Sequence, residues 1–137
     1  MKNINLQKIV AVKGQAGLFH LVNYNPKGFF LQPFEGGVIR FVSNEKGKVL
    51  ALGNVDLRLA NDESINLLEV FRLMEKETIP EVHTIEALID YFHKIAELDK
   101  SIAPTHLQKV VKWYSMIVDH FGSNSMVNEE VDGLTII

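Results

Sequence analysis

The sequence predicts an α+β chain in which a small SH3-like β-barrel is followed by a three-helix module. Short segments rich in β-branched and aromatic residues, separated by turn residues, occupy the first part of the chain. From Asn61 onwards the apolar residues adopt the three–four spacing of amphipathic helices. We therefore expect a basic SH3-like barrel at residues 1–60, a three-helix module at 61–122 and a mobile, acidic and apolar tail at 123–137.

The charge distribution changes at the same place. Residues 1–60 hold eight Lys/Arg against three Asp/Glu, which gives +5, whereas residues 61–100 hold ten acids against four bases, which gives −6. The net charge of −3 hides this difference. Such a split is typical of two modules, of which the basic one is suited to an acidic partner. Attraction between the two halves is an equally good explanation.

Five short strands are expected in the first 60 residues. They cover Leu18–Tyr24, Phe29–Phe34, Val38–Ser43, Lys48–Leu52 and Val55–Leu59. Turn residues separate the first three strands at 25–28 and 35–37. The last strand alternates apolar and polar residues, which indicates a half-buried strand. Because a closed barrel removes most exposed strand edges, this strand is expected to close the sheet.

Three helices are expected in the second half. The first begins at Asn61 or Asp62, which are suitable N-cap residues. The second begins near Thr84. The third has Pro104 in its first turn and ends at Gly122, following the usual preference for proline at the start of a helix and glycine after its end.

The residues that carry chemistry do not form a recognisable catalytic pattern. The sequence has no cysteine, no Gly-x-Ser-x-Gly run and no glycine-rich loop ending in Lys-Ser/Thr. The five histidines are scattered. His93 and Glu97 stand four residues apart, but a single pair at this spacing is more often a surface ion pair than a metal site. We expect a protein that is not an enzyme and that binds neither a cofactor nor a metal ion.

A second stripe on the expected third helix is the candidate site for a partner protein. It consists of His106, Lys109, Trp113, Met116 and His120. Tryptophan and methionine are enriched where proteins meet. The alternative, in which Trp113 packs against the barrel, stays open. The favoured function is a non-catalytic binding or adaptor protein in a protein or ribonucleoprotein assembly, and a homodimer is compatible with the apolar helices.

Binding of RNA or DNA by the basic barrel is the alternative function. The residues expected to meet phosphates are Lys13, Lys27, Arg40, Lys46, Lys48 and Arg58. Tyr24, Phe30 and Phe34 would stack on bases if they point outward and would fill the barrel if they point inward. The sequence pI of 5.9 argues against strong non-specific binding.

Three segments carry a resemblance to a protein family. The runs Leu6–Val10 and Lys13–Phe19 look like the opening of an uncharacterised family of small bacterial proteins, a domain of unknown function. The run Lys109–Tyr114 is similar to the C-terminal helical segment of that family. The resemblance implies a cytoplasmic bacterial protein with a barrel-like part followed by helices, and it implies no activity. No apolar run approaches the ~20 residues of a membrane span, so no membrane insertion is expected.

Overall fold

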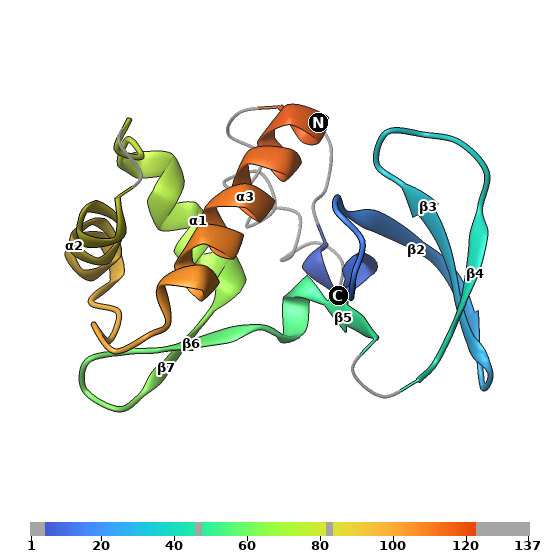
Figure 1. The fold of residues 1–137 in the computed structure, drawn as a ribbon, viewed down its shortest axis with the longest axis horizontal. Helices are drawn as coiled ribbons and strands as arrows, with labels where there is room; N and C mark the ends of the chain where they lie inside the picture. Colours follow the sequence, from blue (N-terminus) through green and yellow to red (C-terminus); the bar gives the residue numbers. More distant parts are fainter. Residues whose placement is uncertain (1–4, 46–47, 82–83, 123–137) are drawn as a thin grey trace, which may run out of the picture. The chain divides into compact units, whose positions relative to one another are not determined.

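The computed structural model describes residues 5–45, 48–81 and 84–122 and divides the chain into two compact units. The sheet unit covers Asn5–Val55, and the helical unit begins at Asp56 (Figure 1). The tail predicted at 123–137 lies outside the described residues.

The sheet unit is built on five antiparallel strands. These are β1 (Ile9–Val12), β2 (Phe19–Asn25), β3 (Gly28–Pro33), β4 (Arg40–Ser43) and β5 (Val49–Ala51). Their order is β4-β3-β2-β1-β5, so that β4 and β5 are the edges. Within the described residues no pairing joins these two edges. The α+β class is confirmed, whereas the SH3-like barrel is not, because the sheet does not close.

The strand expected to close the barrel forms a hairpin instead. It is present as β6 (Asp56–Arg58), which pairs with β7 (Ser64–Asn66) in a separate two-stranded sheet. The turn between them is tight, with Asp62 in the left-handed region at a φ of 72° and its N–H donating to the Leu59 carbonyl over 3.1 Å. Closing a short loop costs less conformational entropy than closing a long one. Pairing of β6 with β7 is therefore favoured over pairing with a distant strand.

The interior strand β1 is not among the strands expected from the sequence. Its residues form a continuous apolar run without alternation, which is typical of a strand covered on both faces. It pairs with β2 on one side and β5 on the other. Ile9, Val10 and Val12 are at most 3% exposed. A fully buried strand therefore lacks the two-residue periodicity by which strands are recognised.

The core of the sheet unit lies on one face of the sheet. Its buried residues are Val10, Val12, Phe19 and Leu31, with Leu21, Phe29, Val42, Val49 and Ala51 packed against them. The registers Leu21↔Leu31 and Phe29↔Val42 place these side chains on the same face, as the two-residue period requires. The intervening residues of β3, β4 and β5 therefore point to the opposite face, which we call the outer face.

The predicted turns between the strands are confirmed. At the β2–β3 turn, the N–H groups of Lys27 and Gly28 donate to Asn25 Oδ1 over 2.8 and 3.1 Å. Asn44 Nδ2 donates to the Pro26 carbonyl over 2.6 Å, which attaches this turn to the end of β4. Between β3 and β4, two glycines at 36 and 37 adopt φ values of 94° and 107°, a region that other residues rarely occupy.

The three predicted helices are present in the helical unit. They are α1 (Leu67–Lys76), α2 (Ile85–Ala96) and α3 (Pro104–Phe121). Thr84 caps α2, and Gly122 follows α3, as expected. The predicted start of α1 is wrong, because Asn66 is its N-cap and accepts the Leu68 N–H over 3.1 Å. Asn61 and Asp62 instead lie in the turn that joins β6 to β7, so the helix begins later than its first capping candidates.

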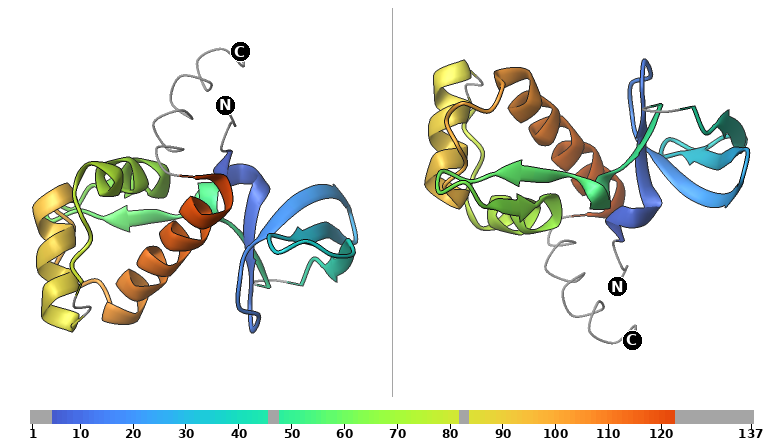
Figure 2. Two further views of the ribbon diagram at one scale, coloured as in Figure 1. Left: turned by 90° about the horizontal axis from the view of Figure 1, so that it is seen from above. Right: turned by 90° about the horizontal axis from the view of Figure 1, so that it is seen from below.

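The core of the helical unit is formed by one face of each helix. Phe71 of α1 and Phe92 of α2 are fully buried, and the Phe71 ring lies 5.6 Å from the Tyr114 ring of α3, between centroids. Figure 1 shows α1 and α3 on the same side of the β6–β7 hairpin, and in the views of Figure 2 the two helices diverge to either side of it. The loop after α2 is tied to the hairpin, since the Asp99 N–H donates to the Arg58 carbonyl over 2.9 Å.

Candidate functional site

Exposed apolar side chains are concentrated in the sheet unit. Among the described residues, the exposed large hydrophobic side chains of this unit are Val22, Tyr24, Val38, Ile39, Phe41 and Leu50. The helical unit contributes only Ile85 in its described part. We use the name apolar patch for Val22, Phe30, Val38, Ile39 and Phe41. Exposed apolar side chains that are grouped on one part of a soluble protein are typical of interaction sites.

Three strands build the centre of the apolar patch on the outer face. Phe30 and Phe41 are directly opposite in the β3–β4 register, and their ring centroids are 5.1 Å apart. A β-bulge in β2 lies between Leu21 and Asn23, so that Val22 and Asn23 together oppose Phe30. Val22 is 50% exposed and Phe41 49%. The bulge therefore adds an apolar side chain to the aromatic pair.

Gly28 provides the space for the Phe41 ring. A Cβ atom at this position would lie 2.7 Å from Phe41 Cζ and 2.3 Å from the Val42 carbonyl oxygen. Both distances are too short for non-bonded carbon contacts. The glycine at the start of β3 thus leaves room for the Phe41 ring, which is 49% exposed.

Among the described strands, β4 is paired on one side only, so that its other side is an open edge of the sheet. The Asn44 N–H donates to the Lys27 carbonyl over 3.0 Å, which identifies these opposed residues as a hydrogen-bonded pair. In an antiparallel ladder such pairs alternate with pairs that direct their groups away from each other. Val42 and Arg40 therefore bond to β3, whereas Phe41 and Ser43 direct their N–H and C=O groups to the open side of β4.

The cationic residues predicted to meet phosphates are not all brought together. Lys13, Lys27 and Arg40 are exposed in the sheet unit, Lys48 is half-buried there, and Lys46 lies outside the described residues. Arg58 lies on β6 in the helical unit, with its Nε 4.0 Å from Asp99 Oδ2.

Positive charge nevertheless predominates in the sheet unit, whose residues 5–55 contain six Lys/Arg and two Glu for a net +4. The Arg40 guanidinium lies 5.1 Å from the centroid of the Phe19 ring, on the core face of the sheet.

The orientation of the three predicted stacking aromatics differs. Tyr24 is 68% exposed at the end of β2. Phe30 is half-buried beside Phe41, and Phe34 is half-buried with its ring centroid 4.6 Å from that of His20. Phe41 was not among the predicted site residues. Its exposure depends on the position of β4 at an edge of the sheet. The local sequence pattern does not predict the order of the strands.

The predicted partner-binding stripe lies along α3. His106, Lys109 and His120 are exposed, and Met116 is half-buried. Trp113 is only 8% exposed and is counted with the core. A role for this stripe in partner binding stays a prediction.

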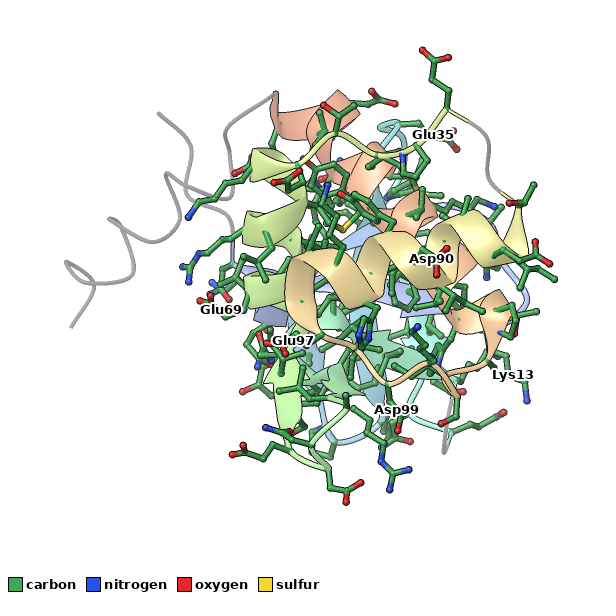
Figure 3. All side chains as sticks on the ribbon, turned by 90° about the vertical axis from the view of Figure 1, so that its left-hand side faces the viewer. Lys13, Glu35, Glu69, Asp90, Glu97 and Asp99 are labelled. Atoms are coloured by element: carbon green, nitrogen blue, oxygen red, sulfur yellow. The ribbon has the colours of Figure 1, made fainter. Side chains whose placement is uncertain are left out.

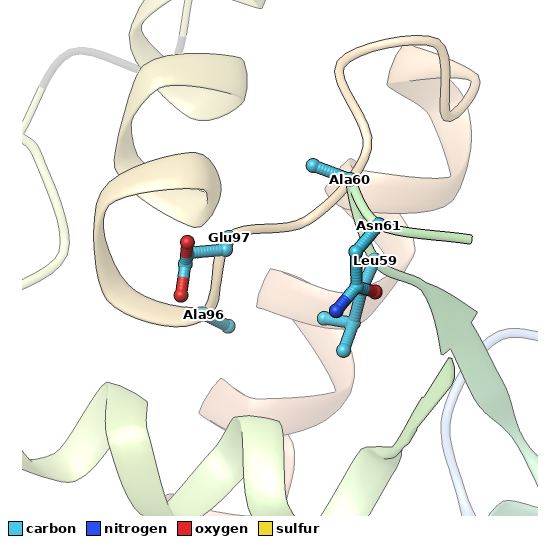
Figure 4. A pocket seen from close by; sticks show the side chains of 5 residues that line it. All are labelled: Leu59, Ala60, Asn61, Ala96 and Glu97. Atoms are coloured by element: carbon cyan, nitrogen blue, oxygen red, sulfur yellow. The ribbon is translucent and has the colours of Figure 1, made fainter. Parts of the chain in front are cut away.

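Two open hollows lie in the helical unit. One is lined by Leu59, Ala60, Asn61, Ala96 and Glu97 (Figure 4). The other is lined by Asp56, Leu57, Arg58, Ser101, Ile102, Ala103 and His106. Figure 3 shows the carboxylates of Asp90 on α2, of Glu97 at the C-cap of this helix, and of Asp99 on the loop that follows. In the described part of the chain, no three His, Asp or Glu residues are grouped to hold a metal ion.

Two tyrosine hydroxyls link the stability of the helical unit to pH in the alkaline range. Burial, reinforced by Tyr114 and Glu77, raises the pKa of Tyr91 from 10.0 to about 12. Burial and Glu75 raise the pKa of Tyr114 to about 12. The Tyr91 hydroxyl also donates to the Glu77 carbonyl over 2.8 Å. Each folded-state pKa lies above the unfolded value, so the neutral hydroxyls stabilise the folded state fully below pH 10 and this contribution is lost as the pH rises through about 12.

We expect the free energy of unfolding to fall with rising pH between 10 and about 12. Chemical unfolding followed by far-ultraviolet circular dichroism measures this dependence. The variant Tyr91→Phe removes one titrating group and should flatten the curve. A wild-type curve that stays level over this range would contradict the prediction.

Comparison with known proteins identifies a fold and no family. No family model matches the chain, and no curated protein matches it. A solution NMR structure of a Bacteroides vulgatus protein, determined as a structural genomics target, is similar with a TM-score of 0.61 and 19% identity. The match covers 85% of this chain and 87% of that one. The chain therefore shares its fold with a bacterial protein. No family model supports the resemblance of residues 6–10 and 13–19 to a family of small bacterial proteins.

One further property follows from the helices. None of those in the described part of the chain is both long and apolar enough to cross a membrane.

Proposed function

We propose that this chain is a non-catalytic binding protein whose sheet unit captures a protein partner. The observation that carries the proposal is the apolar patch, which combines exposed side chains from β2, β4 and the β3–β4 loop. Val38 is 82% exposed and Ile39 46%. Exposing apolar residues to water has no benefit for folding, and their grouping on one unit is typical of a surface that a partner covers.

The neighbouring charges support a partner of opposite sign. Arg40 begins β4, and the Lys27 carbonyl is bonded to Asn44 just beyond its end. The unit carries a net +4. Cationic side chains around an apolar centre increase the association rate with an acidic partner and disfavour a basic one. An adaptor role within a larger assembly is consistent with this arrangement.

Capture from a cell extract tests the proposal with three forms of the full chain. The patch variant is Val38→Ser with Ile39→Ser, because both side chains are exposed and their replacement leaves the core unchanged. The matched control is Ile85→Ser, an exposed residue that is 48% accessible in the helical unit. We expect a partner that wild type and control retain and that the patch variant loses. Equal capture by all three forms would contradict the proposal.

A fourth form of the chain, added to the capture experiment, addresses the stripe on α3. The variant His106→Ala with Lys109→Ala removes two exposed side chains of that stripe. If this variant loses the partner and the patch variant keeps it, the binding site lies on α3 and the role of the apolar patch is overturned.

Nucleic-acid binding is the second candidate function. It is favoured by Tyr24, which is exposed close to Lys27 and is thus available to stack on a base. A titration of the chain with single-stranded RNA and DNA at several salt concentrations separates the two functions. Affinity that falls steeply with salt would support this candidate, since each phosphate neutralised adds to the salt dependence.

A further inference from the structure

We propose, resting on the protein-binding function above, that the partner binds as an extended acidic peptide that adds an antiparallel strand to the open edge of β4. Its apolar side chains would contact the apolar patch, and its carboxylates would lie beside Arg40. Addition of a strand to a sheet edge is a recurrent mode of peptide recognition, in which the main chain provides affinity and the alternate side chains provide specificity.

The open edge carries the first part of the argument. Phe41 and Ser43 direct their N–H and C=O groups away from β3, and β4 pairs with no other strand in the described residues. Natural edge strands are usually protected by lysine, proline or a bulge. β4 contains no lysine, proline or bulge, and its protection is limited to its length of four residues and to Arg40, whose guanidinium lies over the Phe19 ring on the core face.

The alternation of β4 defines the chemistry of the added strand. Phe41 and Ser43 share the outer face with Phe30, and Arg40 and Val42 share the core face. Directly opposed residues of two strands lie on the same face. The residue opposite Phe41 should therefore be apolar, and the residue opposite Arg40 should be acidic. A peptide in which glutamate alternates with valine satisfies both positions.

Two other occupants fit the open edge less well than an acidic peptide. A second copy of this chain would place another sheet unit with a net charge of +4 at the same edge, and like charges at close range are unfavourable. A nucleic acid would satisfy the cations and stack on the aromatic rings. It does not present the regular alternation of donors and acceptors that the outward groups of Phe41 and Ser43 require.

The test uses the isotope-labelled full chain and a short synthetic peptide of alternating glutamate and valine with blocked ends. We expect the amide signals of Phe41 and Ser43 to shift in NMR spectra and to become protected from hydrogen exchange. A peptide with lysine in place of glutamate should not bind. Replacing Arg40 by glutamine should weaken binding about two- to fivefold, while Lys13→Gln, an equal loss of charge at the end of β1, should have no effect.

Selective N-methylation of the peptide distinguishes strand addition from simple apolar contact. The valines lie opposite Phe41 and Ser43, so their N–H groups point to β4, whereas those of the glutamates point away. Methylating two valine nitrogens should weaken binding about tenfold, because two hydrogen bonds are lost. Methylating two glutamate nitrogens should leave binding unchanged. Equal effects of the two modifications would overturn strand addition.

The remaining outcomes separate this inference from the proposed function. Peptide shifts confined to α3, or no peptide binding while the cellular partner is still lost by the patch variant, would overturn the inference and leave the protein-binding function standing. Dimerisation in sedimentation, with Phe41 and Ser43 protected before peptide is added, would identify a second copy as the occupant. Binding of oligouridylate at Phe41 without peptide binding would overturn both proposals in favour of the nucleic-acid function.

Discussion

Replacing Phe71 by alanine is expected to lower the free energy of unfolding of the helical unit by about 3–5 kcal/mol. The side chain is fully buried on α1, and its ring lies 5.6 Å from that of Tyr114 on α3, between centroids. Truncation to alanine removes the free energy gained by burying the ring. It also leaves a cavity between α1 and α3, because the surrounding structure relaxes only in part. A loss of this size is a large part of the stability of an ordinary domain.

Tryptophan fluorescence measures this effect specifically. Trp113 is the single tryptophan of the chain and lies on α3, so its signal reports unfolding of the helical unit. The matched control is Ile85→Ala at the exposed start of α2, for which a change within about 0.5 kcal/mol is expected. If both variants unfold at the same denaturant concentration as the wild type, Phe71 does not hold the helices together as described.

The helices were the most predictable part of the fold. The capping residue Thr84, Pro104 in the first turn and the terminal Gly122 each act within a few residues, and local signals of this kind are visible in a sequence. The start of α1 was predicted wrongly at Asn61 or Asp62, because Asn66 is also a suitable cap. Because β7 pairs with β6, the chain is extended up to Asn66 and the helix begins only after it. This pairing depends on contacts across a hairpin, which a local sequence pattern does not show.

The sheet shows why topology was harder to predict. The segments of β2 to β6 were recognised from their composition and turns, but their partners were not. Closure of a barrel requires that the last strand pair with a strand far away in the sequence, and β6 instead found a partner after the short turn at Asp62. The missed strand β1 is buried on both faces, so its sequence carries no alternation to distinguish it from a helix.

The candidate site was predictable only in its charge. The positive sign of the first half is a matter of counting, and it survives as the net +4 of the sheet unit. The exposure of Phe41 and Val22 depends on an edge position and on a β-bulge, and neither is a property of the residues themselves. Conversely, Trp113 was a candidate for a contact surface because of its residue type, with packing as the open alternative, and the structure buries nine-tenths of it.

Replacing Leu31 by alanine is expected to destabilise the sheet unit by about 2–5 kcal/mol. Leu31 is fully buried, and its backbone is paired with Leu21 of β2 on one side and Arg40 of β4 on the other. Its side chain belongs to the same core cluster as Val10, Val12 and Phe19. The cavity left by its truncation therefore lies under the strands that carry the apolar patch.

Amide hydrogen exchange of β2 and β3 measures this second effect, because Trp113 lies outside the sheet unit. The control is Leu50→Ala on β5, where the side chain is 42% exposed and its removal should change stability by about 1 kcal/mol or less. Protection of the β2 and β3 amides should fall strongly in Leu31→Ala and little in the control. Since β4 is paired only with β3 among the described strands, its edge cannot stay ordered once β3 is released. A Leu31→Ala protein that has lost this protection and still binds the acidic peptide with wild-type affinity would show that the peptide does not use the edge of β4.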